Sequence, residues 1–141
     1  MYVAEDAVSA VAESLAAFRG TGDLAPELLI RFALPLGLAS LELNDSAALV
    51  DLDEPTVLEG ESLRPSVVAT GRRRVTQSYA LDMFERRRET AGLRWWSTLE
   101  AGWINLTLFD RGLGDVTLTD VRELTVDDDV VIEAATFLGL L

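Results

Sequence analysis

Two parts of the chain repeat apolar residues at three- and four-residue steps, the spacing that forms one face of a helix. The first part covers residues 6–18, and Asp6 is the expected N-cap. The second covers residues 76–90, where Asp82 and Arg86 are spaced for an ion pair along the helix surface. The pattern therefore predicts two amphipathic helices.

Shorter stretches alternate apolar and polar residues or are continuously apolar, as strands are. A loop is expected between Pro65 and Gly71, and the acidic run 127–129 favours the start of a helix. The tail, residues 130–141, suits a helix or a strand. Helices mixed with short strands predict an α+β or mixed α/β fold, and 141 residues suit a single domain spanning 1–141. The expected strands are residues 2–3, 38–43, 48–52, 93–97, 103–109 and 116–126.

Composition excludes several kinds of chemistry. The chain has no Cys and no His, which rules out zinc sites built from those residues and nucleophiles activated by histidine. Its net charge of −12 disfavours direct nucleic-acid or anionic-membrane binding. No apolar run is long enough for a membrane span, and the first residues lack a signal-peptide pattern. These features, with the absence of Cys, predict a cytoplasmic protein.

Three local features could carry chemistry. Glu13 on the first predicted helix has the small neighbours Ala10 and Ala17, which would let a ligand approach its carboxylate. The alternative is an ordinary solvent-facing glutamate. The run Arg72–Arg74 precedes a predicted helix N-terminus and could hold a phosphate, or it could be a solvated basic loop. Ser97 follows two tryptophans at a strand end, and is either a site residue or a turn serine beside core aromatics.

Three segments in the same order resemble the RES domain family, whose members include toxins that act on NAD. Residues 2–13 look like the family's strand-then-helix segment, which ends in a functional glutamate. Residues 75–80 resemble its Thr-Gln helix start. Residues 93–97, followed by 105–111, resemble its late serine strand and terminal Phe-Asp segment. The resemblance spans residues 2–111, so residues 112–141 are expected to be a C-terminal extension of the same domain.

This resemblance implies a fold like that of the ADP-ribosyltransferases, a split mixed β-sheet with flanking helices and an NAD cleft. It implies that the chain cleaves the nicotinamide–ribose bond of NAD, either degrading NAD or transferring ADP-ribose, without a metal. By family match, Tyr2, Glu13 and Ser97 are the expected catalytic residues, and all three should line one cleft. Tyr2 and Ser97 would also bind NAD. The implied partner is an Xre-type antitoxin that blocks the cleft.

One part of the family pattern has no match in this sequence. The family has an upstream Gly-Arg-Trp-Asn-like strand region whose arginine helps to hold NAD, whereas this chain starts at the tyrosine. We therefore expect either a truncated start or an N-terminally shortened member, with Arg72 and Arg94 as candidate sources of positive charge. An exposed sheet edge would then be available for homo-oligomers. The alternatives are a catalytically impaired RES remnant that binds a partner, and an acidic structural domain unrelated to NAD.

Overall fold

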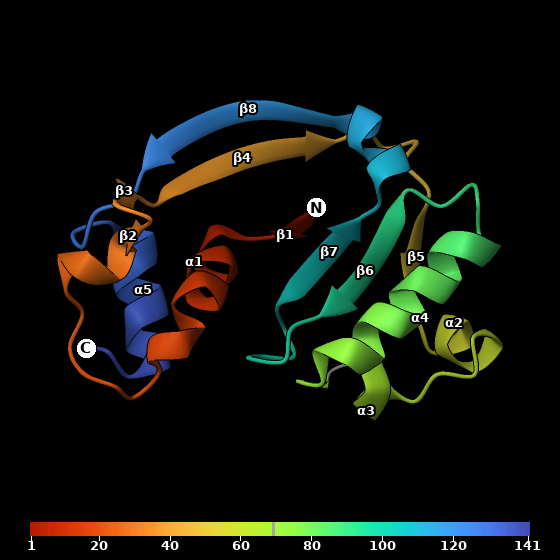
Figure 1. Ribbon diagram of the computed structural model, residues 1–141, viewed down its shortest axis with the longest axis horizontal. Helices are drawn as coiled ribbons and strands as arrows, with labels where there is room; N and C mark the ends of the chain where they lie inside the picture. Colours follow the sequence, from red (N-terminus) through yellow and green to blue (C-terminus); the bar gives the residue numbers. More distant parts are fainter. Residues whose placement is uncertain (69) are drawn as a thin grey trace. The chain divides into compact units, whose positions relative to one another are not determined.

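The computed structural model describes residues 1–68 and 70–141, and these divide into two compact units. The first unit comprises residues 1–5 and 43–116, and the second comprises residues 6–42 and 117–141. Each unit has its own helices and strands (Figure 1). The predicted α+β class, with a mixed sheet flanked by helices, is confirmed.

A four-stranded mixed sheet organises the first unit (Figure 1). Its strand order is β1–β7–β6–β5, with β1 and β5 as the outer strands. The pairs β1–β7 and β7–β6 are antiparallel, whereas β6–β5 is parallel. The bounds are β1 (Tyr2–Ala4), β5 (Leu49–Asp51), β6 (Gly92–Trp96) and β7 (Ile104–Leu108).

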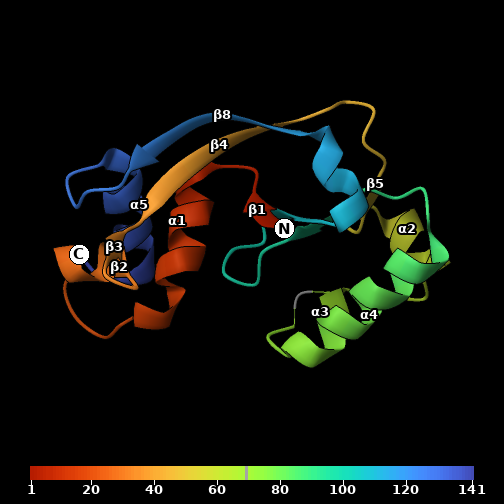
Figure 2. The same cartoon turned by 45° about the horizontal axis from the view of Figure 1, so that its top comes forward.

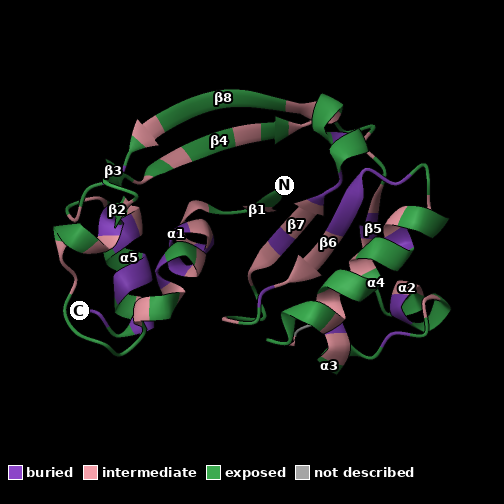
Figure 3. Ribbon diagram, in the orientation of Figure 1, coloured by how far each residue is buried: buried purple, intermediate pink, exposed green. Residues whose placement is uncertain are grey.

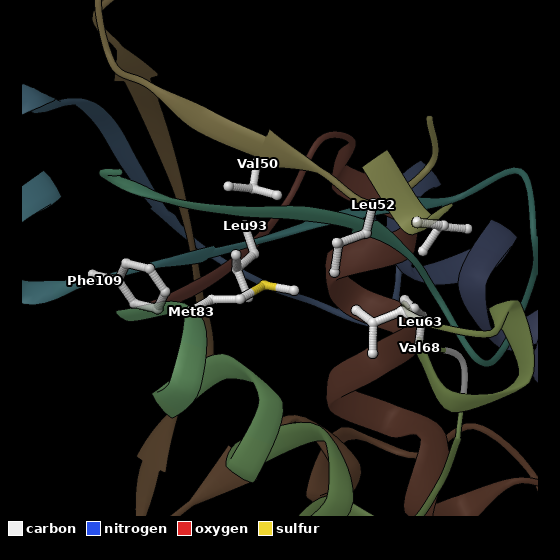
Figure 4. Close-up of a cluster of buried hydrophobic side chains, with 8 residues drawn as sticks. Val50, Leu52, Leu63, Val68, Met83, Leu93 and Phe109 are labelled. Atoms are coloured by element: carbon white, nitrogen blue, oxygen red, sulfur yellow. The ribbon is translucent and has the colours of Figure 1, made fainter. Parts of the chain in front are cut away.

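Helix α4 (Arg73–Arg86) covers this sheet and supplies Met83 to its core. The buried cluster joins side chains of β5 and β6 to side chains from the helices and from Phe109 (Figure 4). The remaining elements are α2 (Pro55–Gly60), α3 (Pro65–Val68) and the 3₁₀ segment Asp110–Asp115. The cluster is Val50, Leu52, Leu58, Leu63, Val68, Met83, Leu93 and Phe109.

Helix α4 begins and ends earlier than the predicted range of 76–90. The Ala91 N–H donates a backbone hydrogen bond of 2.7 Å to the Ala48 oxygen, so the chain has already joined the sheet at that point. The helix must therefore end before it. The predicted pair is present, since Arg86 Nε donates to Asp82 at 2.8 Å. The expected loop after Pro65 is wrong over Pro65–Val68, which forms a helical turn with proline at its first position.

Two helices and two short ribbons build the second unit. Helix α1 (Ala7–Leu15) packs against α5 (Asp129–Leu138), and the two lie side by side in both views (Figures 1 and 2). Strands β4 (Gly37–Leu43) and β8 (Val116–Glu123) form one two-stranded sheet. Strands β2 (Ile30–Arg31) and β3 (Leu34–Pro35) form the other. Short 3₁₀ segments cover Ala16–Phe18 and Pro26–Leu29.

The ends of α1 and α5 follow from local side-chain and backbone chemistry. Asp6 caps α1 as predicted, accepting the Ser9 N–H at 2.8 Å. The acidic run does start a helix, with Asp128 at the N-cap position, and the undecided tail is helical. Helix α5 ends at Gly139, whose φ of 70° lies in the left-handed region. Glycine adopts that conformation without a Cβ clash, which lets Leu140 N–H bond back to Ala135.

Candidate functional site

Tyr2 lies on the outer strand β1, with its side chain half-exposed. Its register partner on β7 is Thr107, and the partner of Thr107 on β6 is Leu93. The Tyr2 ring lies 5.8 Å from the ring of Trp95, at an interplanar angle of 57°. This tilted contact is a favourable geometry for two aromatic rings. One side of the Tyr2 ring is therefore in contact with the Trp95 ring.

Trp95 is itself held in place by a polar contact. Its indole Nε1–H donates a hydrogen bond of 3.1 Å to Thr107 Oγ1. Trp95 also packs against the buried cluster, and it lies two residues beyond Leu93 on β6. Side chains two residues apart share a face of a sheet, so Tyr2, Thr107 and Trp95 lie on the face that α4 covers. These three side chains, two aromatic rings and one hydroxyl, form a cluster that is anchored on the core.

Ser97 directly follows β6, and its side chain is buried. Its N–H bonds to the Trp103 oxygen at 2.7 Å, and its Oγ accepts the Leu99 N–H at 3.0 Å. Ser97 thus lies opposite Trp103, whereas Tyr2 lies opposite Thr107, four residues further along the chain. At about 3.3 Å per residue, the backbone positions of Ser97 and Tyr2 are about 13 Å apart along the strand direction. Tyr2 thus lies on an outer strand of the sheet, whereas Ser97 lies just beyond the end of β6.

The fully buried Asn105 occupies the rung between those two positions. It pairs in register with Ala4 on one side and with Trp95 on the other. Burying an amide at the centre of a sheet costs free energy unless the amide is hydrogen-bonded. An asparagine at this position therefore indicates a structural or functional role for its side chain. In the sequence, Asn105 and Thr107 alternate with apolar residues, and this alternation indicates that both lie on the same face of β7. Trp95, Asn105 and Thr107 therefore extend the predicted set.

Arg94 lies on the rung between Tyr2 and Ala4, so its side chain points to the opposite face of the sheet. Its guanidinium donates to Glu5 at 2.7 Å and to Asp51 at 2.9 Å, and Asp53 lies 3.9 Å away. The hydrogen bond that Arg94 donates to Glu5, together with the charges of both carboxylates, raises the pKa of Arg94. The structure gives Arg94 a bridging role between β1, β5 and β6. Its part in NAD binding stays a prediction.

Arg72 is exposed at the N-cap position of α4, and Arg73 and Arg74 form the first turn. The Arg72 N–H is held by Thr70 Oγ1 at 3.3 Å. Over residues 1–68 and 70–141, no carboxylate lies within salt-bridge distance of these three arginines. Their charge adds to the positive end of the helix dipole. This segment could hold an anion, and the role of Arg72 toward NAD likewise stays a prediction.

Glu13 belongs to the second unit, on helix α1. The residues that α1 buries are Ser9, Val11, Ala12 and Leu15, and Glu13 is half-buried beside them. Asp6 fixes the start of this helix, so the position of the glutamate along α1 is set by a capped and well-packed element. Within its unit, Glu13 therefore lies on a helix whose position is fixed by its N-cap and by its packing against α5.

In the part of the chain that the structure describes, no group of three His, Cys, Asp or Glu side chains could hold a metal ion, and this includes the acidic run 127–129. None of the described helices is long and apolar enough to cross a membrane.

Comparison with known proteins adds the decisive observation. The model of the RES domain matches residues 1–127, which is most of the 141-residue chain. The chain belongs to the RES domain family. No curated protein and no solved structure matches it. The match covers β1, α1, α4 with the preceding Arg72, and the β6–β7 hairpin, and it therefore includes all five predicted site residues.

Proposed function

We propose that this RES-domain chain cleaves the bond between nicotinamide and ribose in NAD. The observation that carries the proposal is the half-exposed Tyr2 ring, fixed against Trp95 on a sheet of a chain that matches the RES model. A flat aromatic group at a partly open position suits a nicotinamide ring, which stacks on such surfaces. Ser97 is proposed to orient the nucleotide by hydrogen bonds.

The reaction needs stabilisation of positive charge on the sugar. As the bond between C1′ and the nicotinamide nitrogen breaks, its electron pair leaves with the neutral nicotinamide, and C1′ becomes oxocarbenium-like. A carboxylate near the ribose stabilises this charge, and Glu13 is the proposed group. Water, phosphate or a protein nucleophile then forms the new bond to C1′; with water, the released proton passes to solvent. Preorganised groups of this kind contribute on the order of 10²–10³ in rate.

Toxin-like action in the cell, held in check by an Xre-type antitoxin, is part of the same proposal. Its support is the family membership. Loss of NAD on expression, prevented by co-expression of the antitoxin, is the expected behaviour.

The direct test is nicotinamide release from NAD by the purified chain, followed by chromatography of the products. We expect Tyr2→Ala to reduce release at least about 100-fold, since it removes both ring and hydroxyl. Tyr79→Ala is the matched control, because Tyr79 is a half-exposed tyrosine on the outer side of α4. If both variants release nicotinamide like the unaltered chain, Tyr2 has no role. The co-product distinguishes the acceptor: ADP-ribose indicates water and ADP-ribose 1″-phosphate indicates phosphate.

A further inference from the structure

The β2–β3 hairpin of the second unit presents apolar side chains to solvent. Strands Ile30–Arg31 and Leu34–Pro35 pair in antiparallel register, and Phe32 and Ala33 form the turn between them. Phe32 is 100% exposed, Leu34 is 68% exposed and Ile30 is 46% exposed. Figure 3 shows this hairpin in the exposed colour beside the buried α1–α5 core. A fully exposed side chain is unusual for phenylalanine, which is among the residue types most often buried.

The turn itself has a strained backbone. Phe32 and Ala33 have φ values of 52° and 63°, in the left-handed region. Two-residue hairpin turns with these angles favour Asn-Gly, because the Cβ of other residues crowds the backbone. Burial of the Phe32 side chain does not offset the strain, since that side chain is fully exposed. Strain held at an exposed position is a feature of ligand clamps and recognition loops.

The base of the hairpin is firmly anchored. The Arg31 guanidinium donates to the Leu28, Ile30 and Ser14 oxygens at 2.9, 2.8 and 3.3 Å, and it lies 5.1 Å from the centre of the Phe18 ring. The Leu36 N–H extends the pairing to the Leu29 oxygen at 2.7 Å. These contacts therefore fix the backbone that carries Phe32, which lowers the entropy cost of docking.

Charge narrows the kind of molecule that this surface can accept. The unit that carries the hairpin contains 11 acidic residues and three arginines, a formal charge of −8. A second copy of the chain or an anionic lipid surface would be repelled by this charge. A protein with a basic surface would be attracted, and an apolar pocket on it would take the aromatic ring.

We propose that the β2–β3 hairpin is a docking element for a basic protein partner, with Phe32 as the anchor that enters an apolar pocket. Ile30 and Leu34 would cover the rim of that pocket. The proposal concerns the second unit alone and does not depend on NAD cleavage.

The test is site-specific photo-crosslinking in the native cell, with p-benzoylphenylalanine in place of Phe32. Leu118 and Leu81 are the control positions, because both are more than half exposed, the first on β8 and the second on α4. We expect one basic protein to cross-link from position 32 and from neither control. Cross-linking only to lipid, only to a second copy, or to no protein would overturn the proposal.

The partner identified by cross-linking is then purified, and its affinity for the full chain is measured. We expect Phe32→Ser in the full chain to weaken binding at least tenfold with an unchanged melting temperature, because the side chain is fully exposed. Ala33→Gly keeps Phe32 and removes the Cβ that strains the turn. This variant should therefore bind the partner at least as tightly as the unaltered chain does. Binding should weaken as salt rises from 50 to 500 mM. Equal affinity for Phe32→Ser, or binding indifferent to salt, would overturn the proposal.

Discussion

The Tyr2 ring rests 5.8 Å from the Trp95 ring, and the same indole donates its N–H to Thr107, the register partner of Tyr2. Three strands therefore fix one phenol: β1 carries it, β6 supplies its neighbouring ring and β7 supplies the hydroxyl that orients that ring. The tyrosine is positioned by a chain of contacts that leads into the core.

Trp95→Phe keeps an aromatic ring but removes the hydrogen bond to Thr107. We expect a roughly tenfold loss of kcat/KM for NAD, mainly through KM, because the ring beside Tyr2 is no longer held at one angle. Thr107→Val should act in the same way, and Thr107→Ser should restore activity, since it restores the hydroxyl. The measurement is steady-state nicotinamide release.

Trp96→Phe is the control for this change. Trp96 also packs against the buried cluster, so its loss should lower stability while leaving KM unchanged. Equal effects on KM from the two tryptophan variants would mean that general loosening of the sheet is responsible, and not the position of Tyr2.

Gly92→Ala should destabilise the sheet that carries the site. A Cβ at Gly92 would lie 2.5 Å from the Thr107 oxygen and 3.0 Å from Leu108 Cα, where backbone must move to make room. We expect a loss of about 1–3 kcal/mol in the free energy of unfolding, the usual range for overpacking. Gly114→Ala is the matched control, because nothing lies within 4 Å of a Cβ there. Urea denaturation checks both, and equal stability of the two variants would contradict the close approach.

Glu61 is expected to make stability depend on pH. Its nearly buried carboxylate accepts hydrogen bonds from Arg86 Nη2 at 2.8 Å and Arg87 Nε at 2.9 Å. The hydrogen bond from Arg86, and then that from Arg87, lowers the pKa of Glu61 from 4.5 despite its burial. The ionised form is thus favoured by folding. Its contribution is complete above about pH 4.5 and is lost as the pH falls through the lowered pKa.

Glu61→Gln should therefore lower the free energy of unfolding at pH 7 by about 1–2 kcal/mol. The difference from the unaltered chain should shrink as the pH is lowered from 4.5. Asp82→Asn is the control, because Asp82 forms an exposed pair with Arg86, and such pairs contribute little. Urea midpoints measured between pH 7 and pH 3.5 decide the matter. A difference that stays constant over this range would show that Glu61 does not act through its charge.

Much of the fold follows from sequence periodicity. The strands at 2–3, 38–43, 93–97 and 103–109 and the capped helix at 6–18 correspond to observed elements, because each has a clear alternation or an apolar stripe. Periodicity does not predict the short helix α2, and the sequence predicts a loop where the helical turn Pro65–Val68 forms. Both are shorter than two turns, so neither has room for a periodic pattern. Each begins with proline, which is common in loops but also favours the first helical position.

The candidate site was only partly predictable. Tyr2 and Ser97 could be selected through family resemblance, whereas the Tyr2–Trp95 contact depends on register between strands about 90 residues apart in sequence. Local spacing carries no information on such register. Arg94 was selected for its charge, but its opposite-face position and its carboxylate partners follow from that same register. The sequence pattern does not predict the exposed turn Phe32–Ala33, because its residues are atypical of turns.

The central claim is that Glu13 supplies the carboxylate for cleavage of NAD. The most direct measurement compares nicotinamide release by the unaltered chain, Glu13→Gln and Glu133→Gln, the last being an exposed glutamate on α5 of the same unit. We predict release by the unaltered chain and by Glu133→Gln, and a loss of at least about 100-fold for Glu13→Gln with an unchanged melting temperature. No release by the unaltered chain, or undiminished release by a folded Glu13→Gln, would contradict the account.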